Sequence, residues 1–377
     1  MRIVQFANFY APTSGGLRTF VEETGRGYTG RGHTRLLVVP GPADLDEQTP
    51  SGRRLTIASP SMFGSDEYRM VTAHRRVLQL FDEFRPDVLE ISDKLAVTWL
   101  SAWARRRGVP TVLFSHERID AVLRTRLPGR FAARGPVPVA ADAVNRALRK
   151  RVDRVVVASA FAAEEFARAG VTDVHRVPLG VDHDTFCPVQ DSTVERDGIE
   201  LVLVSRLSAE KSPQLAVEAL RRLWAAGTPV RLTVIGDGPL VDRITALAAG
   251  LPVRFLGHVA QRSRLARLIG QADVAICPST AETFGLATLE ALACGTPVVV
   301  PDQGALPELV RGAPEGAGVI CMPTPDEFAD GVRTLLAVAP AGRRAAARSV
   351  ALRYPWERTV GELVSLHAGL VAAPACA

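Results

Sequence analysis

A strand that passes directly into a helix and then into a second strand is the feature that most constrains this chain. Residues 274–277 are uniformly apolar, and a proline followed by small polar residues ends that run. Apolar side chains then recur at helical spacing from Phe284 to Leu292, Gly295 stands where a left-handed C-cap falls, and Pro297 begins the next strand. Because other strand-like runs along the chain also alternate with helical segments, we predict an α/β protein with parallel sheets covered on both faces.

The length of the chain favours two domains. A single hydrophobic core rarely grows past ~250 to 300 residues, and this chain has 377. The turn-rich stretch at residues 178–186 divides the strand-like runs into two series and is expected to be a hinge. The first series lies at residues 2–7, 34–39, 54–58, 87–91, 111–114, 154–158 and 174–177, and the second at 200–204, 230–235, 253–256, 274–277, 297–300 and 318–321.

Two glutamates lie on either side of the predicted helix start. Glu282 is in the loop before the helix, and the interval from Phe284 to Glu290 spans only ~9 Å at 1.5 Å per residue. The free amides around Phe284, Gly285 and Leu286 form a helix N-terminus that favours an anion. Two acids around an anion site suit a nucleotide sugar, which carries both hydroxyls and phosphates. The alternative is that both glutamates are ordinary solvated charges.

Two cations share the loop after the strand at residues 200–204. Arg206 offers a planar fork for phosphate oxygens, and Lys211, five residues later, offers a mobile point charge. Both can reach one diphosphate if the loop lies at the carboxyl edge of the sheet, where ligands of such sheets gather. A solvated loop that happens to carry an arginine and a lysine is the alternative.

Glycines follow two strands at places that suit a phosphate. Gly15 and Gly16 come after the first strand and let backbone approach a ligand, although a plain turn is an equal alternative. Gly236 opens a Gly-x-Gly after the strand at residues 230–235, but Val241 replaces the third glycine of the dinucleotide fingerprint. Residues 243–272 also lack any Asp or Glu for a ribose, so we expect no nicotinamide cofactor. The literal fingerprint at residues 25–30 lies between a helix and a strand and is rejected for that reason.

One histidine and one basic segment stand out in the first half. His116 follows the strand at residues 111–114, at the edge where α/β sheets place their chemistry, although a lone histidine is more often structural. Residues 101–151 carry 12 Lys/Arg against 3 Asp/Glu. This excess favours an anionic partner, either a membrane surface or nucleic acid, while general use of arginine on the surface explains it equally well.

Composition restricts the cell compartment. The five cysteines are an odd number, and Cys277, Cys294 and Cys321 lie in apolar strand or helix contexts, which favours reduced thiols in a cytosolic protein. We expect no secretory signal, because the chain enters a strand directly, and no apolar run reaches the ~20 residues of a membrane span.

The spacing Glu282, Phe284-Gly285, Glu290 and then Ala-Cys-Gly-Thr-Pro resembles the C-terminal signature of the retaining glycosyltransferases of family four. That resemblance implies the GT-B fold, with two Rossmann-like doubly wound domains that face each other across a cleft. It implies an acceptor-binding domain at residues 1–183, a nucleotide-sugar-binding domain at 184–355, and a last helix at 356–377 that returns to the first domain.

Short segments in the first half of the chain resemble a narrower group within this family. Residues 6–10, 14–19, 89–93 and 115–120 look like the actinobacterial α-mannosyltransferases that use GDP-mannose to elongate phosphatidylinositol mannosides. The resemblance therefore implies a mannosyltransferase of phospholipid metabolism and of the cell envelope, acting on a glycolipid from the cytoplasm, peripherally at the inner face of the membrane and without nucleic acid. A transferase that uses a UDP-linked sugar on a small molecule or polysaccharide, a nucleotide-sugar epimerase on the same fold, and a binding protein without catalysis remain alternatives.

The resemblance also assigns roles to single residues. No metal or other cofactor is expected, because the literal Asp-x-Asp at residues 182–184 falls on the interdomain connector of the family. The catalytic residues implied are Arg206, Lys211, His116 and Glu282, and the donor-binding residues are Gly15, Gly16, Gly236, Val259, Arg264, Phe284, Gly285, Leu286 and Glu290. A membrane or acceptor face is predicted at Arg118, Arg124, Arg126, Arg130, Arg149, Lys150 and Arg151.

Overall fold

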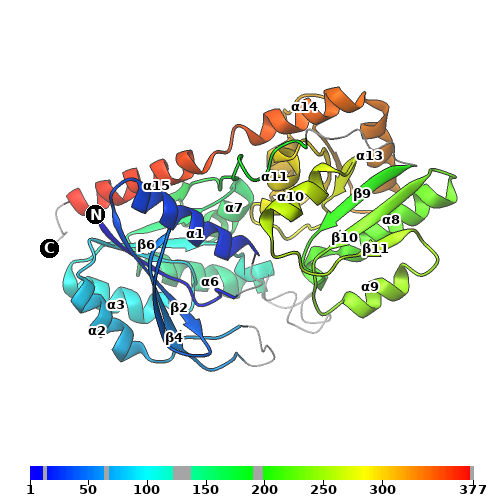
Figure 1. The fold of residues 1–377 in the computed structure, drawn as a ribbon. Coiled ribbons are helices and arrows are strands. Elements are labelled where there is room, and N and C mark those ends of the chain that lie inside the picture. The colour runs from blue at the N-terminus through cyan, green and yellow to red at the C-terminus, as the bar shows by residue number, and fades with distance from the viewer. Residues whose placement is uncertain (12–14, 63–67, 122–136, 190–197, 374–377) are drawn as a thin grey trace. The chain divides into compact units, whose positions relative to one another are not determined.

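A computed structural model describes residues 1–11, 15–62, 68–121, 137–189 and 198–373 (Figure 1). These residues form two compact units, one of residues 1–179 together with 356–377 and one of residues 180–355. The chain enters the second unit after Leu179, whereas the predicted domain boundary lies after residue 183. The reason is local: the Val181 amide donates to the Tyr354 carbonyl at 2.9 Å, and Val181 pairs with Pro355 as an isolated parallel bridge.

The first unit is built on an eight-stranded sheet of order β3-β4-β2-β1-β5-β6-β7-β8. All of these neighbours pair in parallel except β3 and β4, which are antiparallel. The strands are β1 (Arg2–Phe6), β2 (Thr34–Gly41), β3 (Leu45–Thr49), β4 (Gly52–Ala58), β5 (Val88–Ile91), β6 (Thr111–Ser115), β7 (Arg154–Val157) and β8 (Val174–Arg176). The helices are α1 (Gly15–Gly30), α2 (His74–Phe84), α3 (Val97–Arg107), α6 (Val137–Arg149), α7 (Ala160–Arg168) and α15 (Trp356–Ala372).

The rejected glycine fingerprint at residues 25–30 lies inside α1. Gly25 and Gly27 pack closely there, because a Cβ on Gly25 would lie 2.7 Å from Arg35 Cζ and one on Gly27 would lie 2.4 Å from Val360 Cγ2 of α15. These glycines therefore allow close packing, and at Gly27 helix α15 packs directly against α1.

A polar cluster holds α15 on the first unit from inside. Glu90 of β5 is buried, and its Oε1 accepts a hydrogen bond from the Tyr28 hydroxyl at 2.5 Å. His367 of α15 is fully buried, with Nε2 2.9 Å from the same carboxylate oxygen. Gln5 donates to Glu90 Oε2 and accepts from the buried Arg35 guanidinium. Burial raises the pKa of Glu90, but His367 and these hydrogen bonds outweigh it and lower the pKa below its ordinary value.

The second unit is an all-parallel, six-stranded sheet of order β11-β10-β9-β12-β13-β14. Uniformly buried β12 and β13 lie in its interior, as strands covered on both faces require. The strands are β9 (Ile199–Val204), β10 (Val230–Ile235), β11 (Val253–Phe255), β12 (Val274–Ile276), β13 (Val298–Pro301) and β14 (Gly318–Cys321). Its helices are η1 (Ala209–Lys211), α8 (Pro213–Ala225), α9 (Val241–Leu247), α10 (Arg262–Gly270), α11 (Leu286–Ala293), α12 (Leu306–Val310), α13 (Pro325–Ala337) and α14 (Pro340–Ala351).

Candidate functional site

Two loops meet at the carboxyl edge of the second sheet, because β9 and β12 are parallel neighbours. Lys211 follows β9 and Glu282 follows β12, and the Lys211 ammonium lies 2.7 Å from Glu282 Oε1. Both side chains keep about a quarter of their surface exposed, at 25% and 27%. The buried Ser279 hydroxyl donates to the Glu210 carbonyl at 2.9 Å and so ties one loop to the other. The structure thus brings together two of the predicted catalytic side chains.

The start of α11 is shaped by a glycine. Gly285 has φ of +94°, a left-handed conformation that side chains rarely adopt, and a Cβ there would lie 2.1 Å from Leu306 Cδ2. Phe284 is buried with its ring 6.1 Å from that of Tyr354, so its side chain anchors the loop and only its backbone is left for a ligand. The next residue, Leu286, opens α11, whose first amides have no partner in the preceding turn of helix. This end of the helix suits an anion.

Glu290, about one turn into α11, has an arginine partner that the sequence did not reveal. Its side chain is 11% exposed, and Oε1 lies 3.5 Å from an Arg262 guanidinium nitrogen. Arg262 is the first residue of α10, whereas the predicted cation, Arg264, lies two residues further along and is exposed. The position at which α10 begins could have pointed to Arg262, because the first residue of the helix and the third residue face different directions. The helix begins three residues after Val259, which is partly buried in the connecting loop.

Gly236 is required by close packing of the backbone. Its φ is +135°, and an added Cβ would lie 1.9 Å from the Ser205 carbonyl oxygen. The backbone of this turn also runs alongside the loop after β9, because the Leu207 amide donates to the Asp237 carbonyl at 2.9 Å. Arg206 lies in that same loop with its side chain exposed. The close approach of the two turns fixes the loop that carries the predicted diphosphate cations.

His116 follows β6 in the first unit and is packed among aromatic rings. Its ring stacks on Phe114 with centroids 4.6 Å apart and an interplanar angle of 17°, and it meets Phe20 of α1 edge-on at 4.7 Å. Burial lowers the pKa of His116 to about 3, so the imidazole is neutral at physiological pH. Gly15 and Gly16, at the start of α1, are exposed, and nothing lies within 4 Å of a Cβ built on Gly15.

The literal Asp-x-Asp motif is a turn. Asp182 Oδ1 accepts hydrogen bonds from the amides of Asp184 and Thr185 at 3.1 and 3.0 Å. Burial raises the pKa of Asp182, but the hydrogen bonds of Thr185 and Asp184 outweigh it and lower the pKa. Across the residues that the structure describes, no three His, Cys, Asp or Glu side chains gather as a metal site would require.

Arg118 differs from the expectation of a cation that faces a membrane or acceptor. Its side chain is only 11% exposed, it pairs with Asp120 and Glu164 at 2.9 and 3.2 Å, and it stacks over Phe161 at 4.1 Å. These contacts give Arg118 a structural role, because its charge is already neutralised inside the first unit. Arg124, Arg126 and Arg130 lie outside the described residues.

The remaining basic residues lie away from His116. Arg149 ends α6 and pairs with Asp173 at 2.8 Å, while Lys150 and Arg151 are exposed in the turn that enters β7. Because β6 and β7 are parallel, residues just before β7 lie at the sheet edge opposite His116, which follows β6. The part of the predicted membrane or acceptor face formed by Arg149, Lys150 and Arg151 therefore lies at the edge of the sheet opposite His116.

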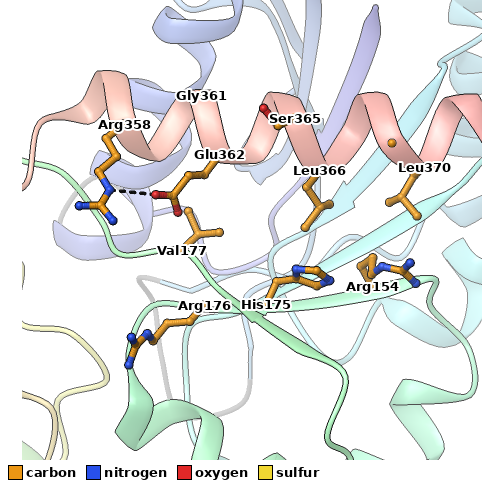
Figure 2. A pocket seen from close by; sticks show the side chains of 11 residues that line it. Arg154, His175, Arg176, Val177, Arg358, Gly361, Glu362, Ser365, Leu366 and Leu370 are labelled. Carbon is orange, nitrogen blue, oxygen red and sulfur yellow. Dashed lines mark hydrogen bonds and ion pairs between the residues drawn. The ribbon is translucent and has the colours of Figure 1, made fainter.

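A groove of about 710 Å³ runs between α15 and the β7–β8 end of the first sheet (Figure 2). Figure 2 shows the Arg358 side chain reaching Glu362, one helical turn along α15, at 2.9 Å. None of the predicted site residues that the structure describes lines this groove. Its lining comprises Arg154, His175, Arg176, Val177, Arg358, Gly361, Glu362, Ser365, Leu366, Gly369 and Leu370.

Comparison with known proteins identifies the family. A family model described as "Glycosyltransferase Family 4" matches residues 14–185, and one described as "Glycosyl transferases group 1" matches residues 198–338. A Mycobacterium tuberculosis protein named GDP-mannose-dependent alpha-(1-6)-phosphatidylinositol dimannoside mannosyltransferase is 39% identical over 385 aligned residues, which cover 100% of this chain and 98% of the relative. The chain belongs to glycosyltransferase family 4.

Other relatives of this family 4 glycosyltransferase agree. A GDP-mannose-dependent alpha-mannosyltransferase from the same species is 30% identical over 82% of this chain and 81% of its own length. Among solved structures, sucrose-phosphate synthase from Thermosynechococcus elongatus superimposes with a TM-score of 0.79 at 21% identity, covering 99% of this chain and 100% of its own. WaaG, a glycosyltransferase of lipopolysaccharide biosynthesis, superimposes with a TM-score of 0.72 at 17% identity, covering 97% and 100%. The predicted GT-B fold is therefore confirmed, with two Rossmann-like units built on parallel sheets.

Proposed function

We propose that this family 4 glycosyltransferase moves a mannosyl residue from GDP-mannose to a phosphatidylinositol mannoside, with retention of the α-configuration. The observation that carries the proposal is the identity of 39% along the whole length of a mycobacterial protein named for this reaction. The charge set at the carboxyl edge of the second sheet supports it, because Lys211, Glu282 and Glu290 suit a donor with a diphosphate, a sugar and a ribose.

We assign the donor to the second unit, where each part of the donor has a side chain or backbone group suited to bind it. Arg206, Lys211 and the amides before Leu286 stabilise the diphosphate as negative charge develops on it. Glu282 accepts hydrogen bonds from the transferred sugar, and Glu290 accepts them from the ribose. The Lys211 ammonium lies 2.7 Å from Glu282 Oε1, so the group proposed to bind the diphosphate and the group proposed to bind the sugar are neighbours.

The transfer step proposed is a substitution on one face of the sugar. The bond from the anomeric carbon to the diphosphate oxygen breaks, the bond to the acceptor hydroxyl oxygen forms, and the acceptor proton passes to the departing phosphate. Neutral His116 orients a sugar hydroxyl and takes no proton, consistent with its low pKa. His116→Ala should therefore lower kcat while leaving the Kd for GDP nearly unchanged.

The proposal includes catalysis without a metal ion. Arg206, Lys211 and the helix amides supply the positive field that a divalent cation supplies elsewhere. Activity should persist in EDTA. Loss of activity in EDTA with recovery on adding Mg²⁺ or Mn²⁺ would refute this part of the proposal and return attention to residues 182–184.

Peripheral contact with the inner face of the cell membrane, without nucleic acid, completes the proposal. No helix in the described ranges has the length and apolarity that crossing a bilayer demands. Lys150 and Arg151 are exposed next to each other, and a basic residue near an anionic surface contributes ~1 kcal/mol to binding. Binding to vesicles that contain phosphatidylinositol should weaken as salt rises and in Lys150→Glu/Arg151→Glu, whereas equal binding to neutral vesicles would refute the contact.

The deciding experiment is product analysis with radiolabelled GDP-mannose. With a phosphatidylinositol mannoside acceptor we expect an α-linked glycolipid one mannose longer, and little turnover without the acceptor. Mannose release or isomerisation without acceptor would favour a hydrolase or epimerase, and transfer only from UDP-sugars would refute the donor. A β-linked product would refute retention.

A further inference from the structure

Arg262 lies between Glu290, which the proposed function assigns to the ribose, and the aromatic ring of Phe186. Its guanidinium nitrogen is 3.5 Å from Glu290 Oε1, and its Cζ lies 5.0 Å from the centroid of the Phe186 ring. The Arg262 side chain is 37% exposed, whereas the Glu290 side chain is 11% exposed. The cation thus reaches a largely buried carboxylate from the solvent side while resting on an aromatic face, the arrangement that a cation–π contact favours.

The aromatic platform is itself fixed to the helix that carries Glu290. Phe186 is fully buried, and its carbonyl accepts a hydrogen bond from Arg348 at 2.8 Å. The same Arg348 nitrogen donates to the carbonyl of Ala293, the last residue of α11, at 2.7 Å. One arginine therefore holds both the ring under Arg262 and the end of the helix on which Glu290 stands.

We infer that Arg262 is a positioning residue for the carboxylate that binds the donor ribose. The inference rests on the proposed function, since it takes Glu290 as the ribose acceptor. An ionised carboxylate has about four acceptor sites, so a guanidinium on one oxygen leaves sites for both ribose hydroxyls. Arg262 holds the orientation of the carboxylate, and hydrogen bonds to a charged acceptor are the stronger kind.

The ligand class that follows is a ribonucleoside diphosphate with free 2′- and 3′-hydroxyls. Arginine suits the position better than lysine, because a planar guanidinium can stack on Phe186 and direct an N–H at Glu290 at the same time. Arg262→Lys should therefore recover only part of what Arg262→Gln loses.

The test compares two nucleotides on purified protein by isothermal titration calorimetry. GDP and 2′,3′-dideoxy-GDP differ only in the hydroxyls assigned to Glu290. We expect Arg262→Gln to weaken GDP binding about three- to tenfold and to leave dideoxy-GDP binding unchanged. Arg267→Gln is the matched control, because it removes the same charge from an exposed position of α10. In a Glu290→Gln background, Arg262→Gln should cost no further GDP affinity.

The outcomes separate this inference from the proposed function. If the wild-type protein does not bind GDP, the proposed donor is wrong. If wild type binds GDP but Arg262→Gln weakens both nucleotides equally, or remains additive with Glu290→Gln, the positioning role is refuted and the donor stands. Near-ultraviolet circular dichroism of each variant establishes that the second unit is folded, so that a loss of binding is assigned to the site.

Discussion

The Lys211 ammonium and the Glu282 carboxylate form an ion pair of 2.7 Å between loops that follow neighbouring strands. Each is only partly shielded from water, so the pair alone adds little to stability. Under the proposed function, Glu282 holds this cation at the sheet edge to which the diphosphate is assigned, and such preorganised charge is the condition for electrostatic stabilisation of a leaving anion.

Removal of this cation should slow the chemical step. We expect Lys211→Ala to lower kcat ~10²- to 10³-fold at saturating GDP-mannose, since preorganised charge near a developing anion is lost. Arg243→Ala, at an exposed position of α9, serves as a charge-matched control and should retain kcat. Near-normal turnover of Lys211→Ala would show that the lysine does not act on the leaving group.

Gly285 should be intolerant of any side chain. Its φ of +94° and the 2.1 Å approach of Leu306 to an added Cβ mean that Gly285→Ala must shift the start of α11. We expect about 1 to 3 kcal/mol lower stability and weaker GDP binding. Gly250→Ala is the comparison, because φ there is +75° but the space around the Cβ is open. Equal GDP affinities in the two variants would contradict a role for this helix start in donor binding.

The half-buried His116, which follows β6, predicts how this group's contribution to stability changes as pH falls. The pKa of His116 is lowered to about 3 in the folded state, while the unfolded chain keeps a value near 6.5. Between these values the unfolded state binds more protons, so this group's contribution to stability is complete above pH 6.5 and is lost as pH falls. The urea midpoint of His116→Phe, which retains a ring between Phe20 and Phe114, should fall less than that of wild type from pH 7 to 5.

The Glu90–His367 contact should determine whether α15 stays docked. His367→Ala leaves a buried carboxylate without that partner, and we expect about 3 kcal/mol lower stability of the first unit at pH 7. Because the pKa of Glu90 is lowered, the contribution of its charge is present at neutral pH and is lost as pH falls below the ordinary value of 4.5. Ser365→Ala, exposed on the same helix, is the control. Hydrogen exchange along α15 measures the effect directly, and unchanged protection would contradict it.

Alternation of apolar runs was enough to predict the α/β class. The glycosyltransferase family was predicted from a resemblance carried by Glu282, Phe284-Gly285, Glu290 and the Ala-Cys-Gly-Thr-Pro that follows. β3 was missed because Leu45–Thr49 is polar and partly exposed, so it carries no hydrophobic alternation and gains its hydrogen bonds only from β4. Arg118 was misjudged because its partners Asp120 and Glu164 neutralise it only in three dimensions. Arg262 escaped notice because the sequence does not reveal which of Arg262 and Arg264, two residues apart on α10, faces Glu290.

The docking of α15 on the first unit also sets an order of events during synthesis. Residues 180–355 form a unit that is continuous in sequence, so it can fold as soon as its own strands have emerged. The first unit must wait for α15, because Glu90 has no imidazole beside it until His367 has left the ribosome. A nascent chain stalled before residue 356 should therefore expose the apolar face of α1 that Val360 later covers, and should bind chaperones more strongly than the released protein.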